Sequence, residues 1–297
     1  MTTTQTQPDA LVPQTGPGRN RRVSSRSRSR ARVEVWRWIA IVAVILFFLF
    51  PLLWMLLSAF KTSLDITDPS AMFSFSPTLR NFTNVLTEQN FLPFIWNSLI
   101  VGVVSTALSL VIGVPAAYAM TRFGMHRSSG TLLLARIIPG VALLVPWYFV
   151  FSRLALVGGY TPLIISHMFV TLPLIAWIML SFFQGIPLEL EEAGRVDGLS
   201  SIGVFRKIAL PLAVPGIATA SILAFIFSWN NFLFALVLSG EATRTLPVAI
   251  FNFIAYSSID WGGLMAASTI ITLPVMVMAL FTQKYIVSGL TAGATKG

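Results

Sequence analysis

A short segment of the chain concentrates acidic side chains. Four of the eleven Asp and Glu residues lie within nine positions, and they are Glu189, Glu191, Glu192 and Asp197. Carboxylates can act as general acids or bases, but catalysis also needs a nucleophile, a histidine or a metal beside them. The segment has no histidine and no cysteine. We therefore interpret it as a charged surface that a soluble partner could bind, and not as a catalytic centre.

The chain also lacks the residue sets of several enzyme classes. It has no cysteine, which excludes disulfides, a thiol nucleophile and cysteine-ligated metal, and its two histidines are His126 and His167. A P-loop needs Gly-Lys followed by Ser or Thr, and none of the four lysines follows a glycine. No catalytic, cofactor-binding or metal-binding residue is predicted. Any ATP that drives this protein is expected to be hydrolysed, with Mg²⁺, by another chain.

Two adjacent amides stand in an otherwise apolar run, at Trp229-Asn230-Asn231. Amides deep in an apolar environment are unfavourable unless they are hydrogen-bonded. Trp229, Asn230 and Asn231 are therefore the candidate lining of a route for a polar solute. Hydroxyl side chains within membrane helices more often bridge helices, and we favour that role for Ser228, Ser221, Thr219 and Thr171. His167, within another apolar run, is interpreted in the same way.

The composition is that of a membrane protein with several spans. Of the 297 residues, 55% are hydrophobic and 10% are charged, and the mean hydropathy is +0.79. Soluble domains carry about 25% charged residues, so this chain has too few to cover a surface that faces water. Six apolar runs are each long enough to cross a hydrocarbon core of about 30 Å as a helix. These predicted spans are Trp38–Phe60, Leu99–Tyr118, Thr131–Phe151, Thr161–Phe183, Leu212–Leu238 and Gly263–Phe281.

An arginine-rich arm precedes the first span. Its residues are mostly Thr, Gln, Pro, Ser and Arg, a composition typical of disorder, so we expect a disordered arm at residues 1–35 and a membrane domain at residues 36–297. With six spans both termini share one side, and that side receives 15 Lys and Arg against four on the other. The positive-inside rule then predicts cytoplasmic termini in the cytoplasmic membrane, with residues 61–96 and 239–262 outside. The arm is expected to contact anionic lipid rather than nucleic acid.

The acidic cluster lies between the fourth and fifth predicted spans, on the expected cytoplasmic side. Pro187 suits a first helical turn, Asp197-Gly198 is a turn signal, and Ser200 or Ser201 can cap a second short helix. Pro211 begins the next span. The segment at residues 185–211 is thus expected to form two short helices at a turn. An ordinary amphipathic connector is the alternative interpretation.

The same segment closely resembles the EAA loop of ABC importer permeases. The matching residues are Glu192-Ala193-Gly194-x-x-Asp197-Gly198, followed by Ile208-x-Leu210-Pro211. Gly194 departs from the usual second alanine. Further stretches resemble the carbohydrate branch of that family, in its maltose type. These stretches are Pro115–Ala119, Phe183-x-x-Ile186-Pro187, Leu210–Leu212, Trp229–Phe232, Thr245–Val248, Asp260–Gly262 and Gly289–Gly297. Asn231 stands where the usual pattern has Glu.

The resemblance implies an all-α polytopic protein of six transmembrane helices with the type I importer architecture. It also implies a permease subunit that moves a sugar or oligosaccharide, beside a second homologous permease, a dimer of cytoplasmic ATPase subunits and an extracytoplasmic solute-binding protein. ATP and Mg²⁺ would bind the ATPase, and this chain would bind no cofactor. The implied ATPase-coupling residues are Glu189, Glu191, Glu192, Ala193, Gly194, Asp197 and Gly198.

Two other function classes stay open from the residues alone. A stand-alone secondary transporter of a small polar solute would show inverted repeats with broken helices, and no clear pair is visible. A membrane enzyme acting on lipid would need a polar catalytic cluster, which the acidic segment does not supply. Co-purification with an ATPase would separate the importer from both.

Overall fold

The computed structural model describes residues 24–125, 130–132, 137–254 and 259–294. Throughout these residues the regular elements are helices, and β pairing is limited to two isolated bridges, Gly158 with Ser239 and Ile254 with Ile259. The predicted all-α fold class is confirmed.

The chain divides into two compact units, residues 1–53 and 54–297. Most of α1, Ser24–Ala59, belongs to the first unit, where Phe47 and Phe48 are 75% and 68% exposed. A helix that is apolar on every side is typical of a membrane span. Because α1 begins at Ser24, the expected boundary between the arm and the membrane domain, at residue 35, lies inside a helix. The physical reason is that an existing helix extends readily through Arg and Ala residues. Residues 1–23 of the predicted arm lie outside the described residues.

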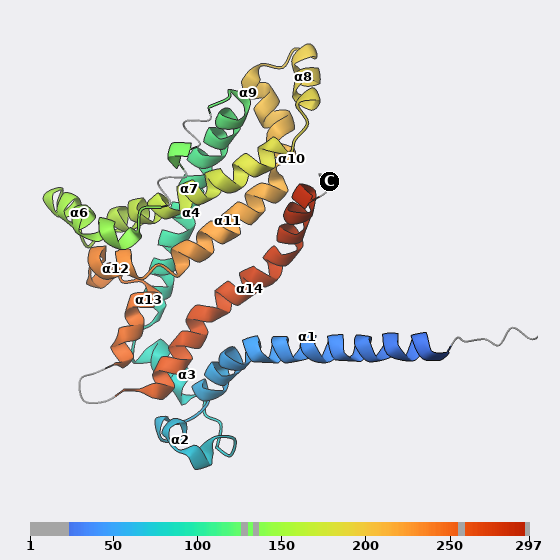
Figure 1. Cartoon of the computed structure of the whole chain (residues 1–297). Helices are drawn as coiled ribbons and strands as arrows, with labels where there is room; N and C mark the ends of the chain where they lie inside the picture. Colours follow the sequence, from blue (N-terminus) through green and yellow to red (C-terminus); the bar gives the residue numbers. More distant parts are fainter. Residues whose placement is uncertain (1–23, 126–129, 133–136, 255–258, 295–297) are drawn as a thin grey trace, which may run out of the picture. The chain divides into compact units, whose positions relative to one another are not determined.

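Four long helices frame the second unit (Figure 1). They are α4 (Leu92–Arg122), α7 (Tyr160–Gln184), α11 (Val214–Trp229) and α14 (Trp261–Ala294). α4, α7 and α11 pack against one another, and α14 packs on α11. Shorter helices are α6 (Gly140–Arg153), α8 (Leu188–Val196), α9 (Ser201–Val204), α10 (Leu210–Leu212) and α12 (Leu233–Leu238). α8 and α9 lie together at one end of the unit (Figure 1).

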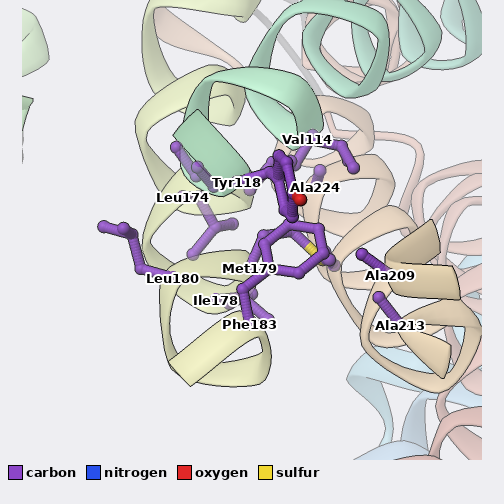
Figure 2. Packing of buried hydrophobic residues seen from close by; sticks show 14 residues of the cluster. Val114, Tyr118, Leu174, Ile178, Met179, Leu180, Phe183, Ala209, Ala213 and Ala224 are labelled. Carbon is purple, nitrogen blue, oxygen red and sulfur yellow. The ribbon is translucent and has the colours of Figure 1, made fainter. Parts of the chain in front are cut away.

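Small and aromatic side chains fill the core where α4, α7 and α11 meet. Figure 2 shows Tyr118 of α4 among Met179 and Phe183 of α7 and Ala224 of α11. Small residues let membrane helices approach closely, which favours dispersion contacts between them. Tyr118 is therefore fixed in a packed core one turn before the end of α4.

Four of the six predicted spans each correspond to one long helix, α1, α4, α7 or α14. By length and apolar composition α1, α4, α7 and α14 can each cross a membrane, and a pair of helices, residues 201–212 and 214–229, forms a fifth candidate bent by 73°. The predicted third span, Thr131–Phe151, overlaps in its second half with α6, an apolar helix of 14 residues, and residues 133–136 of this span lie outside the described residues. The polytopic architecture expected from composition is confirmed.

The fifth predicted span, Leu212–Leu238, is not one continuous helix. α11 ends at Trp229, and α12 begins at Leu233. Asn230 and Asn231 occupy the break. Asparagine side chains compete with the backbone for hydrogen-bond partners, which favours helix ends over helix interiors.

Residues 61–96 and 239–262 contain short helices rather than long loops. The first segment holds α2 (Ser63–Thr67), the 3₁₀ turn η1 (Pro69–Ala71) and α3 (Arg80–Thr87), and the second holds η3 (Glu241–Thr243), α13 (Leu246–Ala249) and η4 (Ile250–Phe253). Ser63 Oγ donates to Asp260 Oδ1 at 3.1 Å, so the two segments contact each other.

Lys61 is buried, although it is one of the four basic residues that the topology prediction assigns to the outer side of the membrane. Its side chain is 1% exposed, and Nζ donates to the carbonyl oxygens of Ala71 and Met72 at 3.1 and 2.5 Å. Nζ also lies 5.1 Å from the ring centroid of Trp54 and 4.6 Å from that of Phe75. Carbonyl oxygens and aromatic faces together stabilise a buried ammonium group. Lys61 therefore stabilises the fold of the segment at residues 61–96.

Candidate functional site

The acidic segment forms a helix with a defined C-terminal end. Leu199 N donates to Gly194 O and Gly198 N donates to Arg195 O, both at 3.0 Å. These two bonds form a Schellman motif, in which one residue takes the left-handed conformation. That residue is Gly198, with a φ of +87°. The turn predicted at Asp197-Gly198 is confirmed.

The second short helix is capped as the sequence predicts. Ser200 Oγ accepts a hydrogen bond of 3.2 Å from Gly203 N at the start of α9. The chain then widens into a π-helical turn, Phe205–Ala209, in which Leu210 N donates to Phe205 O. Pro211 follows directly. A proline ring clashes with the carbonyl four residues before it, and a wider turn relieves that clash.

Glu191 points inward from α8 and pairs with the end of α4. Its side chain is fully buried, Oε1 lies 2.7 Å from Arg122 Nε, and Oε2 accepts a 2.7 Å hydrogen bond from Tyr118 OH. Arg122 Nη2 also donates to Ile186 O at 3.0 Å. A buried carboxylate is unfavourable without partners, and charge-assisted bonds of this length are strong. We call Tyr118, Arg122 and Glu191 the α4–α8 tie.

Aromatic and apolar side chains surround the tie. The ring of Tyr118 lies 5.3 Å from that of Phe183 and 4.8 Å from that of Phe205, centroid to centroid. Three residues after Glu191, Gly194 is buried so closely beneath Ile208 that a Cβ there would overlap the end of the isoleucine side chain. α8 is thus held by packing as well as by charge.

The remaining predicted coupling residues lie on the exposed side of α8 and in the turn that follows it. The five exposed members are Glu189, Glu192, Ala193, Asp197 and Gly198. Val196 at the end of α8 and Ile202 in α9 are also exposed, at 87% and 70%. Apolar side chains rimmed by charges are typical of a protein-binding surface. We call these seven residues the α8 outer face.

The structure thus divides the predicted coupling set into two groups. Glu191 and Gly194 face the chain's own core, so the Glu191 carboxylate is occupied by Arg122 and Tyr118. A role in coupling stays a prediction for the whole set. Tyr118 and Arg122 were not predicted as site residues, although they lie one helical turn apart at the end of a span without acids.

The structure places Trp229, Asn230 and Asn231 around the break in the fifth span, in three different settings. Trp229 is buried, and its Nε1 donates to Ile271 O at 3.1 Å. Asn230 is exposed, and Asn231 is partly exposed with its Oδ1 accepting from Phe234 N at 3.2 Å. Trp229 thus contacts a neighbouring helix and the two amides are accessible at the surface of this chain, while a role of the three residues in the route stays a prediction.

Hydroxyl groups and one imidazole link α4, α7 and α11. His167 Nδ1 lies 2.7 Å from Ser228 Oγ, which lies 3.0 Å from Ser105 Oγ. Ser109 Oγ and Thr171 Oγ1 lie 2.7 Å apart. The interhelical interpretation of His167, Ser228 and Thr171 is confirmed. Thr219 and Ser221 instead donate to carbonyl oxygens of their own helix, Pro215 O and Ile217 O, so the prediction that these two hydroxyls bridge helices is wrong.

Within the described residues no group of three or more His, Cys, Asp and Glu side chains could hold a metal ion. His126 lies outside the described residues. The arrangement around α8 combines an exposed face of charged and apolar side chains with a buried attachment to α4.

The chain is similar to known proteins over most of its length. A family model described as "Binding-protein-dependent transport system inner membrane component" matches residues 109–292. The sulfoquinovosyl glycerol transport system permease protein SmoH of Agrobacterium fabrum is 38% identical over 256 residues, which cover 84% of this chain and 89% of that protein. The trehalose/maltose transport system permease protein MalG of Thermococcus litoralis is 38% identical over 259 residues, covering 84% and 92%.

The fold is shared with a solved transporter. The crystal structure of a bacterial ABC transporter involved in the import of the acidic polysaccharide alginate contains a chain with a TM-score of 0.73 and 21% identity. The match covers 87% of this chain and 98% of that chain.

Proposed function

This chain belongs to the family of binding-protein-dependent transport system inner membrane components, and on that premise we propose that its cargo is a sugar or oligosaccharide. It is the membrane-spanning permease subunit of an ABC importer. The carbohydrate assignment rests on relatives that carry names such as trehalose/maltose and sulfoquinovosyl glycerol permease and that align over 84% of this chain.

We also propose a partner for the α8–α9 segment, and the position of this segment within the family match supports that proposal. Residues 109–292 run from the middle of α4 into α14 and include the whole segment. Its outer face presents Val196 and Ile202 beside four charged or small positions of the EAA-like pattern. A cytoplasmic ATPase dimer is the proposed partner of this face, and it would bind the ATP and Mg²⁺.

The proposed mechanism is a two-state cycle. ATP closes the ATPase dimer, the α8 outer face follows the bound ATPase subunit, and the spans reorient towards a solute-binding protein outside. A conformational change of this kind requires contacts that differ in free energy between the two states. Glu189, Glu192 and Asp197 supply exposed charges for such contacts. Both termini would lie in the cytoplasm.

The proposed route for the sugar passes the break between α11 and α12, where Asn230 and Asn231 stand. A second homologous permease would complete the route from its other side. Amide groups can exchange their bonds to backbone for bonds to sugar hydroxyls, since each carries both donors and an acceptor.

Uptake into liposomes tests the function. The importer, purified with its ATPase, second permease and binding protein, is reconstituted with ATP inside and offered labelled trehalose, maltose and sulfoquinovosyl glycerol. We expect at least one of these to accumulate in an ATP-dependent way. The matched control is a complex whose ATPase lacks its P-loop lysine. Equal uptake by the control would favour a secondary transporter, and failure of all three sugars would contradict the carbohydrate assignment.

A further inference from the structure

α8 is attached to the frame of the permease at more than its two chain ends. Along the chain it follows α7 and leads through α9 and α10 to α11. The α4–α8 tie adds a link to α4, formed by residues that are 69 and 73 positions apart in sequence. α8 is therefore joined to each of the three helices that form the packed core.

The chemistry of the tie makes it hard to break during a cycle. Glu191 is fully buried, and its two oxygens are both occupied, one by Arg122 Nε and the other by Tyr118 OH. Removing one partner from a buried ion pair is strongly destabilising, because it leaves an uncompensated charge. A bond of this kind favours joint movement of its two helices over separation.

Arg122 reinforces that arrangement at a second point. Its Nη2 donates to Ile186 O, in the connection that leads from α7 into α8. One guanidinium group thus binds both α8 and the connection that leads into α8. A lysine has a single charged nitrogen and reproduces this pair of contacts poorly. The side chain of Arg122 is 10% exposed, so little water competes for these bonds.

We infer that the α4–α8 tie makes α8 and the adjoining end of α4 move as one body, so that displacement of α8 by an ATPase passes directly into α4. Tyr118 and Arg122 are positioning residues in this inference, because they act through Glu191 and not through contact with ATP or cargo. α4 packs along α7 and α11, which spreads the displacement through the core. The inference rests on the proposed function, which supplies the force on α8.

Two conservative variants test the tie through the coupling of hydrolysis to uptake. Glu191→Gln removes the charge, and Tyr118→Phe removes one hydroxyl while keeping the ring that packs on Phe183. In reconstituted importers we expect sugar uptake per ATP hydrolysed to fall about tenfold while hydrolysis stays within about twofold, as expected for a loss of roughly one charge-assisted bond. Glu88→Gln, the same change at an exposed residue just after α3, is the matched control.

The double variant shows whether the residues act as one unit. If they do, Glu191→Gln with Tyr118→Phe has the same uptake per ATP as Glu191→Gln alone, because the single change already releases α8 from α4. Hydrolysis and uptake that fall in proportion, together with a lower melting temperature, would mean that the tie only stabilises the fold. Unchanged uptake per ATP in both single variants would also overturn the inference.

A distance measurement tests the same inference without any sugar. Because the chain has no cysteine, Leu188→Cys on α8 and Val111→Cys on α4 provide the two spin-label sites on this subunit, and both positions are exposed. In the complete importer we expect one narrow distance distribution, unchanged between the nucleotide-free state and a state held by a non-hydrolysable ATP analogue. Glu191→Gln should broaden it. A shift in the unaltered importer would contradict joint movement, whatever the outcome of the uptake experiment.

Discussion

At the scale of single residues, Gly198 has the clearest conformational requirement. Its φ of +87° costs a residue with a side chain roughly 1–2 kcal/mol, more for a β-branched one, whereas asparagine tolerates this region. No atom lies within 4 Å of a Cβ built there, so the penalty is conformational and not steric. We expect Gly198→Val to abolish uptake and weaken ATPase association, and Gly198→Asn to retain most of both.

The measurement for Gly198 is uptake together with recovery of the ATPase on the purified permease. Membrane insertion should be unchanged in both variants, because the residue lies in an exposed turn. Normal ATPase stimulation in Gly198→Val would show that the left-handed turn is not needed for docking.

Asn231 combines a capping bond with a place in the proposed route. Its Oδ1 accepts from Phe234 N in the first turn of α12, and loss of such a cap costs about 1 kcal/mol. Asn231→Leu removes the cap and any bond to sugar, whereas Asn231→Asp keeps an acceptor. We expect Asn231→Leu to lower uptake and the melting temperature, and Asn231→Asp to restore the melting temperature. Unchanged uptake kinetics in Asn231→Leu would remove this residue from the route.

At the scale of elements, the contact between α8 and the π-helical turn explains the departure from the usual alanine at position 194. A Cβ on Gly194 would overlap Ile208 Cδ1, the flexible end of that side chain. Glycine within a helix is about 1 kcal/mol less favourable than alanine. The close contact with Ile208 explains why glycine nevertheless occupies this position. The glycine and the isoleucine are therefore matched to each other.

That match predicts a stability difference between two variants. Ile208→Val removes the overlapping carbon, so Gly194→Ala added to Ile208→Val should raise stability by about 1 kcal/mol over Ile208→Val alone. Gly194→Ala in the unaltered background should gain less, since Ile208 must shift. Thermal unfolding of the purified permease measures both. Equal gains in the two backgrounds would show that Ile208 moves without penalty.

At the scale of the whole molecule, the eight arginines up to Arg37 dominate the charge bias between the two sides. Neutralising all eight would leave seven Lys and Arg on the expected cytoplasmic side against four on the other. Because the positive-inside bias sets orientation, we expect part of the variant population to insert inverted. Protease accessibility of the termini in membrane vesicles measures this.

Deletion of residues 1–18 is the matched control for the arm, since it removes one acid and no basic residue. That variant should keep the native orientation and native uptake. A fully native orientation after neutralisation of the eight arginines would show that the later spans determine topology.

Local sequence signals predicted much of this structure. The six apolar runs, the caps at Ser200 and Gly198 and the turn at Asp197 depend on neighbours only a few residues away, so composition and short patterns identify them. The EAA-like spacing then indicated the family. The break after Trp229 was marked by two asparagines, yet the length of the apolar run favoured one continuous span.

The sequence by itself therefore determined the class of protein, the positions of the apolar runs and the place of the two short helices that follow α7. Only the tertiary structure decided which carboxylate of that segment turns inward. Glu189, Glu191 and Glu192 are alike in type and adjacent in sequence, and Glu191 is buried because the folded bundle brings Arg122 and Tyr118 to its position. Burial of a charge depends on a partner that can lie anywhere along the chain, whereas helices and turns depend on residues close by.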